Sequence, residues 1–256
     1  MSFFKERVPT ALFKEDGHYL GRPADFDDKI IARRLNLVKA IPNFIGKDLT
    51  LLDIGCGNGA SMLTLAPQMK SCHGVEVSSE HQAGFEKHKE AMDIQNCSYQ
   101  VADISKTNLK TTYDRIISFE VIEHLEDENH VEFYYNHLNP GGIMAISVPN
   151  KWWIFETHGA KLPLLPWNRV PFFSWLPRPI HERYANARIY TTKRITSLLK
   201  KHGFKILSTA YITAPMDVLP KGKFKDVVVK SFFEKDTTKL PFKSTSIFVV
   251  AEKPLL

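Results

Sequence analysis

A regular alternation of short apolar runs with amphipathic segments constrains the fold of this chain more than any other feature. A continuously apolar run at 49–55 and strand-like segments at 72–78, 97–103, 113–120 and 142–150 are separated by segments with helical spacing. A short, continuously apolar run is typical of a parallel strand that is buried on both faces. The alternation of strands with helices predicts an open, doubly wound α/β sheet.

The last part of the chain returns to this pattern after an irregular stretch. A helix is expected over 191–203, capped by Thr191 or Thr192 and ended by Gly203, with two final strands at 204–212 and 244–253. We therefore predict an α/β, Rossmann-like, mostly parallel seven-stranded sheet that ends in a late β hairpin. One domain, 1–256, would comprise an N-terminal arm and helix (1–48), a core (49–150), an aromatic-rich insertion after strand five (151–187), and the final helix and hairpin (188–256).

Composition excludes several classes of protein. An apolar share of 43% and a charged share of 24% are ordinary for a globular chain, and no apolar run is long enough to cross a bilayer. Charges interrupt the N-terminus too often for a signal peptide, so we expect a cytoplasmic location. The three cysteines, Cys56, Cys72 and Cys97, share no C-x-x-C spacing, which favours free thiols. A net charge of +6 is compatible with an anionic partner without indicating which one.

The first strand runs into a glycine-rich turn that predicts a ligand site. Gly55, Gly57 and Ala60 fit the dinucleotide pattern G-x-G-x-x-A, and Glu76 ends the second strand, where a ribose would meet a carboxylate. Asp53, two residues before the first glycine, would repel a pyrophosphate. It would instead suit an ammonium group. The presence of Asp53 therefore argues against a nicotinamide-dependent oxidoreductase.

Several successive motifs resemble those of class I S-adenosylmethionine-dependent methyltransferases. They are the D-x-G-x-G-x-G run at 53–59, the acid at Glu76, the triplet 102–104 and the L-N-P-G-G run at 138–142, which together cover roughly 45–150. The resemblance implies that Glu76 holds the ribose hydroxyls, Asp103 the adenine amine, and Ile104 the ring. The cofactor contacts that it implies are Asp53, Gly55, Cys56, Gly57, Glu76, Val77, Asp103, Ile104, Phe119 and Glu120.

The sequence E-V-I-E-H at 120–124 follows the fourth strand. On a helical turn, Glu120, Glu123 and His124 would share one face and could hold a cation or supply a base. This run resembles the E-x-x-E-H element of the ubiquinone-biosynthesis O-methyltransferases, which implies a magnesium-type ion on those three residues and a cofactor contact by Phe119. In the alternative, the carboxylates only stabilise a helix N-terminus and the imidazole packs.

Two histidines are the candidate catalytic bases. We place His124 beside the reacting methyl group, and His158 is the second candidate because an imidazole titrates near neutrality. Glu156 and the pair His181–Glu182 are further acid–base candidates, although each is an ordinary loop residue in the alternative.

The insertion at 151–187 holds all four tryptophans, interleaved with Arg169, Arg178 and Arg183. Three interpretations stay open: a lid over an apolar acceptor, a peripheral membrane contact, and plain packing against the sheet. Lysine-rich residues 221–243 would add attraction to anionic headgroups.

These features predict S-adenosylmethionine-dependent O-methylation of a small or lipid-linked hydroxyl, of polyprenoid, lipid or glycan type. An RNA or protein methyltransferase is the first alternative, although the lysines do not belong to a recognised nucleic-acid module. A non-catalytic cofactor-binding subunit is the second, and the intact glycine-rich turn opposes it. The sequence predicts no oligomeric state.

Overall fold

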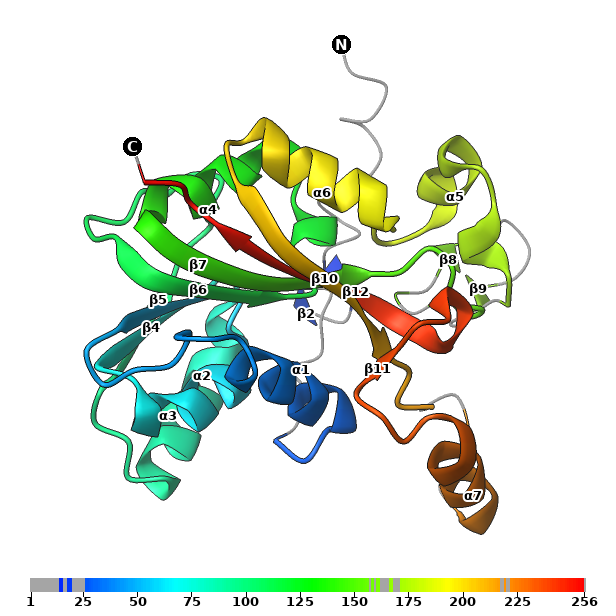
Figure 1. The fold of residues 1–256 in the computed structure, drawn as a ribbon, viewed down its shortest axis with the longest axis horizontal. Coiled ribbons are helices and arrows are strands. Elements are labelled where there is room, and N and C mark those ends of the chain that lie inside the picture. The colour runs from blue at the N-terminus through cyan, green and yellow to red at the C-terminus, as the bar shows by residue number, and fades with distance from the viewer. Residues whose placement is uncertain are drawn as a thin grey trace.

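The computed structural model describes residues 14–15, 18–19, 26–156, 158, 160–161, 166–167, 171–216, 219 and 222–255. Its centre is one sheet in the order β11-β10-β12-β7-β6-β3-β4-β5. Pairing is parallel from β5 through β4, β3 and β6 to β7, and antiparallel from β7 through β12 and β10 to β11. The Rossmann-like, mostly parallel sheet with a late β hairpin is thus confirmed (Figure 1).

The elements have the following bounds. The strands of the main sheet are β3 Thr50–Ile54, β4 Ser71–Glu76, β5 Cys97–Val101, β6 Tyr113–Phe119, β7 Leu138–Pro149, β10 Lys205–Thr213, β11 Thr237–Thr238 and β12 Ser244–Glu252. Two short hairpins pair β1 Lys14–Glu15 with β2 His18–Tyr19 and β8 Ala160–Lys161 with β9 Pro166–Trp167. The helices are α1 Lys29–Lys39, α2 Ala60–Leu65, α3 Gln82–Ala91, α4 Glu132–His137, α5 Arg178–Tyr184, α6 Thr192–Lys201 and α7 Lys223–Phe232. Short 3₁₀ turns are η2 Ala66–Gln68, η3 Ser79–His81, η4 Ile122–His124, η5 Glu128–Val131, η6 Phe173–Trp175 and η7 Pro241–Lys243.

Three details differ from the expected arrangement. The described sheet has eight strands rather than seven, because two residues, Thr237 and Thr238, pair with the end of β10 as β11. The fifth parallel strand begins at Leu138 rather than at 142, and its pairing with β6 is irregular near Gly141, which has a φ of 74°. The basic stretch between the final strands contains a helix, α7, that the sequence pattern did not indicate.

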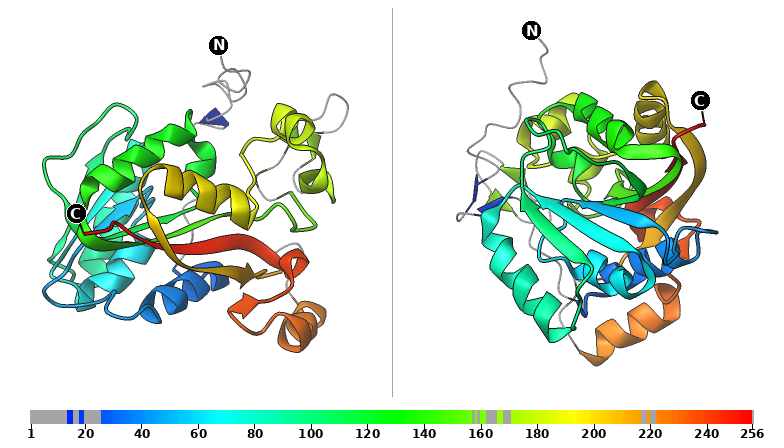
Figure 2. Two further views of the ribbon diagram at one scale, coloured as in Figure 1. Left: turned by 45° about the horizontal axis from the view of Figure 1, so that its top comes forward. Right: turned by 90° about the vertical axis from the view of Figure 1, so that its left-hand side faces the viewer.

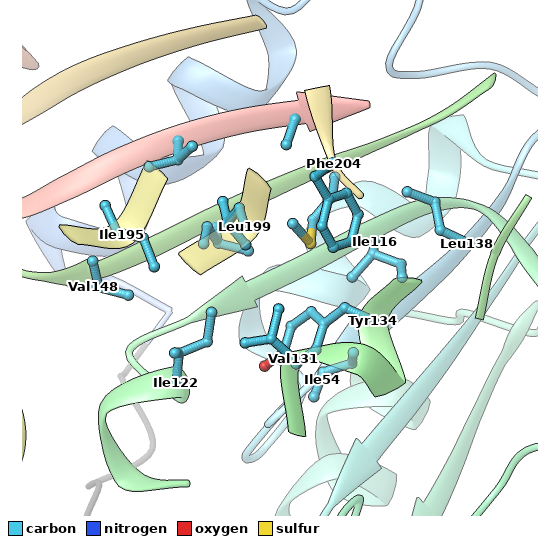
Figure 3. Close-up of a cluster of buried hydrophobic side chains, with 14 of the residues drawn as sticks. Ile54, Ile116, Ile122, Val131, Tyr134, Leu138, Val148, Ile195, Leu199 and Phe204 are labelled. Atoms are coloured by element: carbon cyan, nitrogen blue, oxygen red, sulfur yellow. The ribbon is translucent and has the colours of Figure 1, made fainter. Parts of the chain in front are cut away.

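Strand alternation divides the core between the two faces of the sheet. Leu51 and Ile117 face the layer of α1, α2 and α3, whereas Leu52 and Ile116 face the layer of α4 and α6. The second layer closes over the sheet with Tyr134, Leu199 and other fully buried side chains, several of which are labelled in Figure 3: Ile122, Val131, Tyr134, Leu138, Val148, Ile195, Leu199 and Phe204. Both layers are visible in the two further views (Figure 2). Replacing one such leucine with alanine would lower the free energy of unfolding by about 2–5 kcal/mol. Packing of this strength on both faces of the sheet holds in place the edge at which β3, β4 and β6 end.

The cap of α6 lies where the sequence placed it. The side chain of Thr191 accepts a hydrogen bond from the backbone of Arg194, and Gly203 follows the helix with a φ of 91°. The insertion forms a smaller cluster of its own, in which Phe173, Ala160 and Ala185 are buried together. Among the described residues, no helix combines the length and apolar character needed to cross a membrane.

Candidate active site

The glycine-rich turn after β3 requires glycine for a steric reason. Gly55 has a φ of 71°, and a Cβ atom at that position would lie 2.3 Å from Cγ2 of Val121. Its amide donates to the carbonyl of Val75 at 2.8 Å, which ties the turn to the end of β4. The backbone at this position can therefore approach both a neighbouring strand and a ligand, as the motif predicted.

Glu76 is held at the end of β4 by backbone amides. Its carboxylate accepts hydrogen bonds from Gly57 at 2.9 Å, Val77 at 2.8 Å and Ser78 at 3.1 Å. Oε1 accepts two of these hydrogen bonds and Oε2 one, which leaves an acceptor position on Oε2 for a ligand. The arrangement brings together three of the predicted cofactor residues, Gly57, Glu76 and Val77.

Asp53, the penultimate residue of β3, has an unsatisfied carboxylate oxygen. The residue is buried, and its Oδ2 atom has no hydrogen-bond partner among the described atoms. Burial, followed by repulsion from Glu76, raises the pKa of Asp53 to about 8, against the smaller opposing effect of the Met62 backbone hydrogen bond. A buried oxygen without a partner is costly, so the site favours a cationic ligand that would satisfy it. The ammonium group of a methionine moiety has that chemistry.

The end of β5 lies beside this turn. The amide of Ala102 donates to the carbonyl of Glu76 at 2.8 Å, which places Asp103 and the partly buried Ile104 next to the end of β4. Asp103 accepts from the backbone and hydroxyl of Ser105 and forms an ion pair with Lys106 at 2.9 Å. Burial alone would raise the pKa of Asp103, but these partners outweigh it and lower the pKa. Its predicted contact with an adenine amine stays a prediction.

Two further predicted cofactor contacts, Cys56 and Phe119, lie just after β3 and at the end of β6. Cys56 is buried, and burial raises the pKa of its thiol well above the usual value, so the side chain packs as a neutral group. Phe119 ends β6, and the guanidinium of Arg34 lies 5.5 Å from the centre of its ring.

Glu120 corrects the predicted geometry of the E-x-x-E-H run. It has a left-handed φ of 59° and precedes η4, so the expectation that it shares a helical face with Glu123 and His124 is wrong. Its carboxylate instead pairs with Arg34 at 2.8 Å and accepts from Ser147 at 2.9 Å. Sequence reasoning missed Arg34, although an arginine that interrupts the apolar face of α1 was a signal that could have revealed it.

A cluster of one carboxylate and two imidazoles contains two of the three predicted metal ligands, Glu123 and His124, together with His158. Ligand atoms of Glu123, His124 and His158 lie within 4.8 Å of one another. Glu123 is fully buried, neither of its oxygens has a hydrogen-bond partner at normal distance, and Nε2 of His158 lies 3.6 Å from its Oε1. Burial, followed by Glu120, raises the pKa of Glu123, while burial and the neighbouring His158 lower the pKa of His124. The donor set and the unsatisfied carboxylate fit a divalent cation, with His158 in place of Glu120.

The identity of these donors bears on which ion would suit them. Magnesium prefers oxygen ligands and keeps several waters, whereas two imidazoles and a carboxylate suit zinc or another transition metal. The magnesium-type ion implied by the E-x-x-E-H resemblance therefore fits this set less well than a transition metal does.

His158 is tied to a second buried pair. Its amide donates to Oε1 of Glu156 at 3.1 Å, and Oε2 of Glu156 lies 2.7 Å from Nε2 of His181 in α5. Glu156 and His181 are both buried. Their contact joins α5 to the segment after β7 and fixes the backbone that carries His158, so we interpret this pair as a positioning element.

Some aromatic side chains of the insertion are buried, and others are exposed to solvent. Trp153 and Phe173 are buried, whereas Trp152, Phe172 and Trp175 are exposed and contact one another edge to face. Plain packing thus accounts for only part of the segment. Arg169, one of the arginines noted in this segment, lies outside the described residues.

The comparisons with known proteins identify the family of this chain. The family model described as "Methyltransferase domain" matches residues 25–209. A methyltransferase with this strand order and glycine-rich turn is of class I, and the chain belongs to the methyltransferase domain family.

Individual relatives match shorter stretches. An (S)-tetrahydroprotoberberine N-methyltransferase of Eschscholzia californica is 39% identical over 80 residues, which are 30% of this chain and 23% of that protein. The ubiquinone biosynthesis O-methyltransferase of Nitrobacter winogradskyi is 29% identical over 138 residues, covering 52% of this chain and 49% of that enzyme. The chain thus spans at most about half the length of these curated relatives. A crystal structure of an S-adenosylmethionine-dependent methyltransferase from Clostridium acetobutylicum aligns with a TM-score of 0.57 at 16% identity, over 89% of this chain and 92% of that one, which shows the shared fold.

Proposed function

We propose that this chain transfers the methyl group of S-adenosylmethionine to a hydroxyl group of a small or lipid-linked acceptor. The cofactor supplies an electrophilic methyl group on a sulfonium that is already a good leaving group. Asp53, with its unsatisfied buried oxygen, would hold the ammonium group, and Glu76 the ribose hydroxyls. Orientation of the two reactants at this edge of the sheet would supply much of the acceleration.

The observation that carries the choice of acceptor is the cluster of Glu123, His124 and His158 after β6. A hydroxyl is a poor nucleophile until its proton is removed, so an O-methyltransferase needs a base or an ion near the acceptor. Burial keeps His124 neutral, so its imidazole can accept a hydrogen bond from the acceptor hydroxyl, while the lowered pKa makes it a weaker base than an exposed histidine. A divalent cation bound by these three side chains would supply Lewis acidity that lowers the pKa of the acceptor hydroxyl.

An amine acceptor is the second candidate because of a specific comparison. N-methyltransferases are among the relatives that match this chain. A neutral amine already carries a free lone pair and loses its proton after the transfer, so it depends less on a base. The cluster of Glu123, His124 and His158 therefore favours a hydroxyl acceptor.

Labelled S-adenosylmethionine tests the proposal directly. The protein is incubated with a cell extract, which is then partitioned into organic-soluble, nucleic-acid, protein and small-molecule fractions. We expect label in the organic or small-molecule fraction as a methyl ether, and none with Asp53→Ala. Label confined to RNA or protein would contradict the acceptor class. Cofactor binding without transfer to any fraction would favour a non-catalytic subunit.

The insertion is where we place the acceptor. Trp152, Phe172 and Trp175 offer exposed rings beside the segment that carries His158. Such a surface suits an apolar acceptor and a peripheral membrane contact through 151–187, and both stay proposals. Loss of transfer in Trp175→Ala, with unchanged cofactor binding, would support acceptor binding there.

A further inference from the structure

Helix α7 exposes several apolar side chains to solvent. Phe224, Val227 and Phe232 are 72%, 62% and 64% exposed. At 3.6 residues per turn, Phe224, Val227 and Val228 lie together on one face, and Phe232 extends it by one turn. Val229, the buried residue of the helix, lies about 140° around the helix axis from Phe224, outside the stripe of Phe224, Val227 and Val228. The apolar side of α7 therefore points away from the body of the protein.

Lysines border this apolar face on both sides. On the helical wheel, Lys223 and Lys230 flank one edge and Lys225 flanks the other. The segment 222–243 contains six lysines (Lys223, Lys225, Lys230, Lys235, Lys239 and Lys243) and three acidic residues (Asp226, Glu234 and Asp236). An apolar stripe between basic borders is the pattern of helices that lie in the interface of an anionic bilayer.

The protein fixes the orientation of this helix. Arg33 in α1 donates a hydrogen bond to the carbonyl of Phe233, and Nζ of Lys243 donates to the carbonyl of Phe232 at 3.1 Å. The segment that follows adds two exposed apolar side chains, Leu240 at 44% and Phe242 at 46%. In Figures 1 and 2, α7 projects from the end of the molecule to which α5 of the insertion also belongs.

We propose that α7 and residues 233–243 dock the protein onto an anionic lipid surface. Protruding phenylalanines and valines carry no polar groups that could read a nucleic acid, whereas they can enter the acyl boundary of a bilayer. Long lysine side chains at the edges can extend to the phosphates while their methylenes cover apolar area. The inference does not depend on methyl transfer and concerns a surface separate from the cluster of Glu123, His124 and His158.

Vesicle flotation tests this surface with the whole chain. The probes are phosphatidylcholine vesicles with and without phosphatidylglycerol. We expect wild-type protein to float with the anionic vesicles at low salt, to dissociate as salt rises, and to float poorly with neutral vesicles. The double variant Phe224→Ser/Val227→Ser should bind on the order of tenfold more weakly. Replacing Lys223 and Lys230 by glutamine should weaken binding by about fivefold for each lysine.

Matched controls use exposed residues elsewhere. Leu207 and Leu255 are 43% and 76% exposed, and the chain end beside Leu255 lies far from α7 (Figure 1). Leu207→Ser/Leu255→Ser should float like the wild type, and all variants should keep its melting temperature. Equal flotation with neutral and anionic vesicles, or wild-type flotation by the α7 variants, would overturn the proposal. A wild-type dimer in light scattering that Phe224→Ser/Val227→Ser converts to a monomer would also overturn it, because the occupant would then be a second copy.

Discussion

Nε2 of His158 lies 3.6 Å from Oε1 of Glu123, and this approach joins the segment after β7 to the turn after β6. The two residues come from parts of the chain that the E-x-x-E-H motif does not connect. Because Glu123 is fully buried, a cationic or proton-sharing neighbour is needed to offset its desolvation. The relationship makes His158 part of the same chemical unit as Glu123 and His124.

The first prediction concerns this unit. His158→Gln should lower kcat by about 10²–10⁴-fold if the imidazole serves proton transfer, whereas the dissociation constant for S-adenosylmethionine should stay unchanged. Single-turnover kinetics and calorimetry measure the two quantities separately. His202→Gln, a substitution at the end of α6, is the matched control and should leave both as in the wild type. Equal loss of cofactor binding in His158→Gln would show that the residue supports the fold of the site instead.

A second prediction separates the two candidate ligand sets. Co²⁺ bound by two imidazoles and a carboxylate should give visible absorption bands. Glu123→Gln and His158→Gln should remove them, while Glu120→Gln should retain them, because Glu120 is engaged by Arg34 and Ser147. Bands that persist in Glu123→Gln would contradict the cluster as a metal site. Bands lost in Glu120→Gln would restore the set predicted from the sequence.

The cofactor side of the site could be predicted because it depends on local patterns. Asp53, Gly55 and Glu76 occupy strand ends, and the order of strands follows from their alternation with helices. The carboxyl ends of parallel strands meet at one edge of the sheet. Residues that the pattern placed at the ends of neighbouring strands were therefore expected to lie close together in the fold.

The other side depends on contacts between distant segments, which a pattern does not encode. Arg34 reaches Glu120 from α1, and Arg188 donates to the carbonyls of Glu123 and Leu125 from beyond α5. The helical spacing of Glu120 and Glu123 was misleading, because the backbone enters a left-handed conformation at Glu120. Helix α7 was not predicted although its apolar residues recur at helical spacing, because the lysines among them made the segment look like a basic loop.

A third prediction uses two glycines as a matched pair. Gly55→Ala places a Cβ atom 2.3 Å from Cγ2 of Val121 at a left-handed φ, so the end of β3 must shift. We expect destabilisation by about 1–3 kcal/mol from the backbone strain alone, together with loss of cofactor binding. Gly84 lies in α3 with only Asn58 near its Cβ position, at 3.7 Å. Gly84→Ala should be neutral or stabilise by about 0.5–1 kcal/mol. Urea denaturation measures both, and equal effects would contradict the close approach at Gly55.

The final prediction follows from the protonation of Asp53. Burial and Glu76 raise the pKa of Asp53 from 3.8 to about 8, so the ligand-free protein keeps this proton at neutral pH. An ammonium ligand requires the ionised carboxylate, so binding at pH 7 should release close to one proton. The affinity for S-adenosylmethionine should then rise by about tenfold per pH unit between pH 6 and 7.5. Calorimetry in buffers of different ionisation enthalpy counts the released proton.

The raised pKa of Asp53 also determines how the free energy of unfolding changes with pH. Between pH 3.8 and about 8 the folded chain keeps the proton that the unfolded chain releases. The contribution of Asp53 to the free energy of unfolding is therefore largest at low pH and decreases as pH rises through this range. Asp53→Asn should remove this dependence and the proton release together, whereas Asp27→Asn, at an exposed position, should change neither. Proton release that persists in Asp53→Asn would assign the titration to another group and remove the argument for an ammonium contact at Asp53.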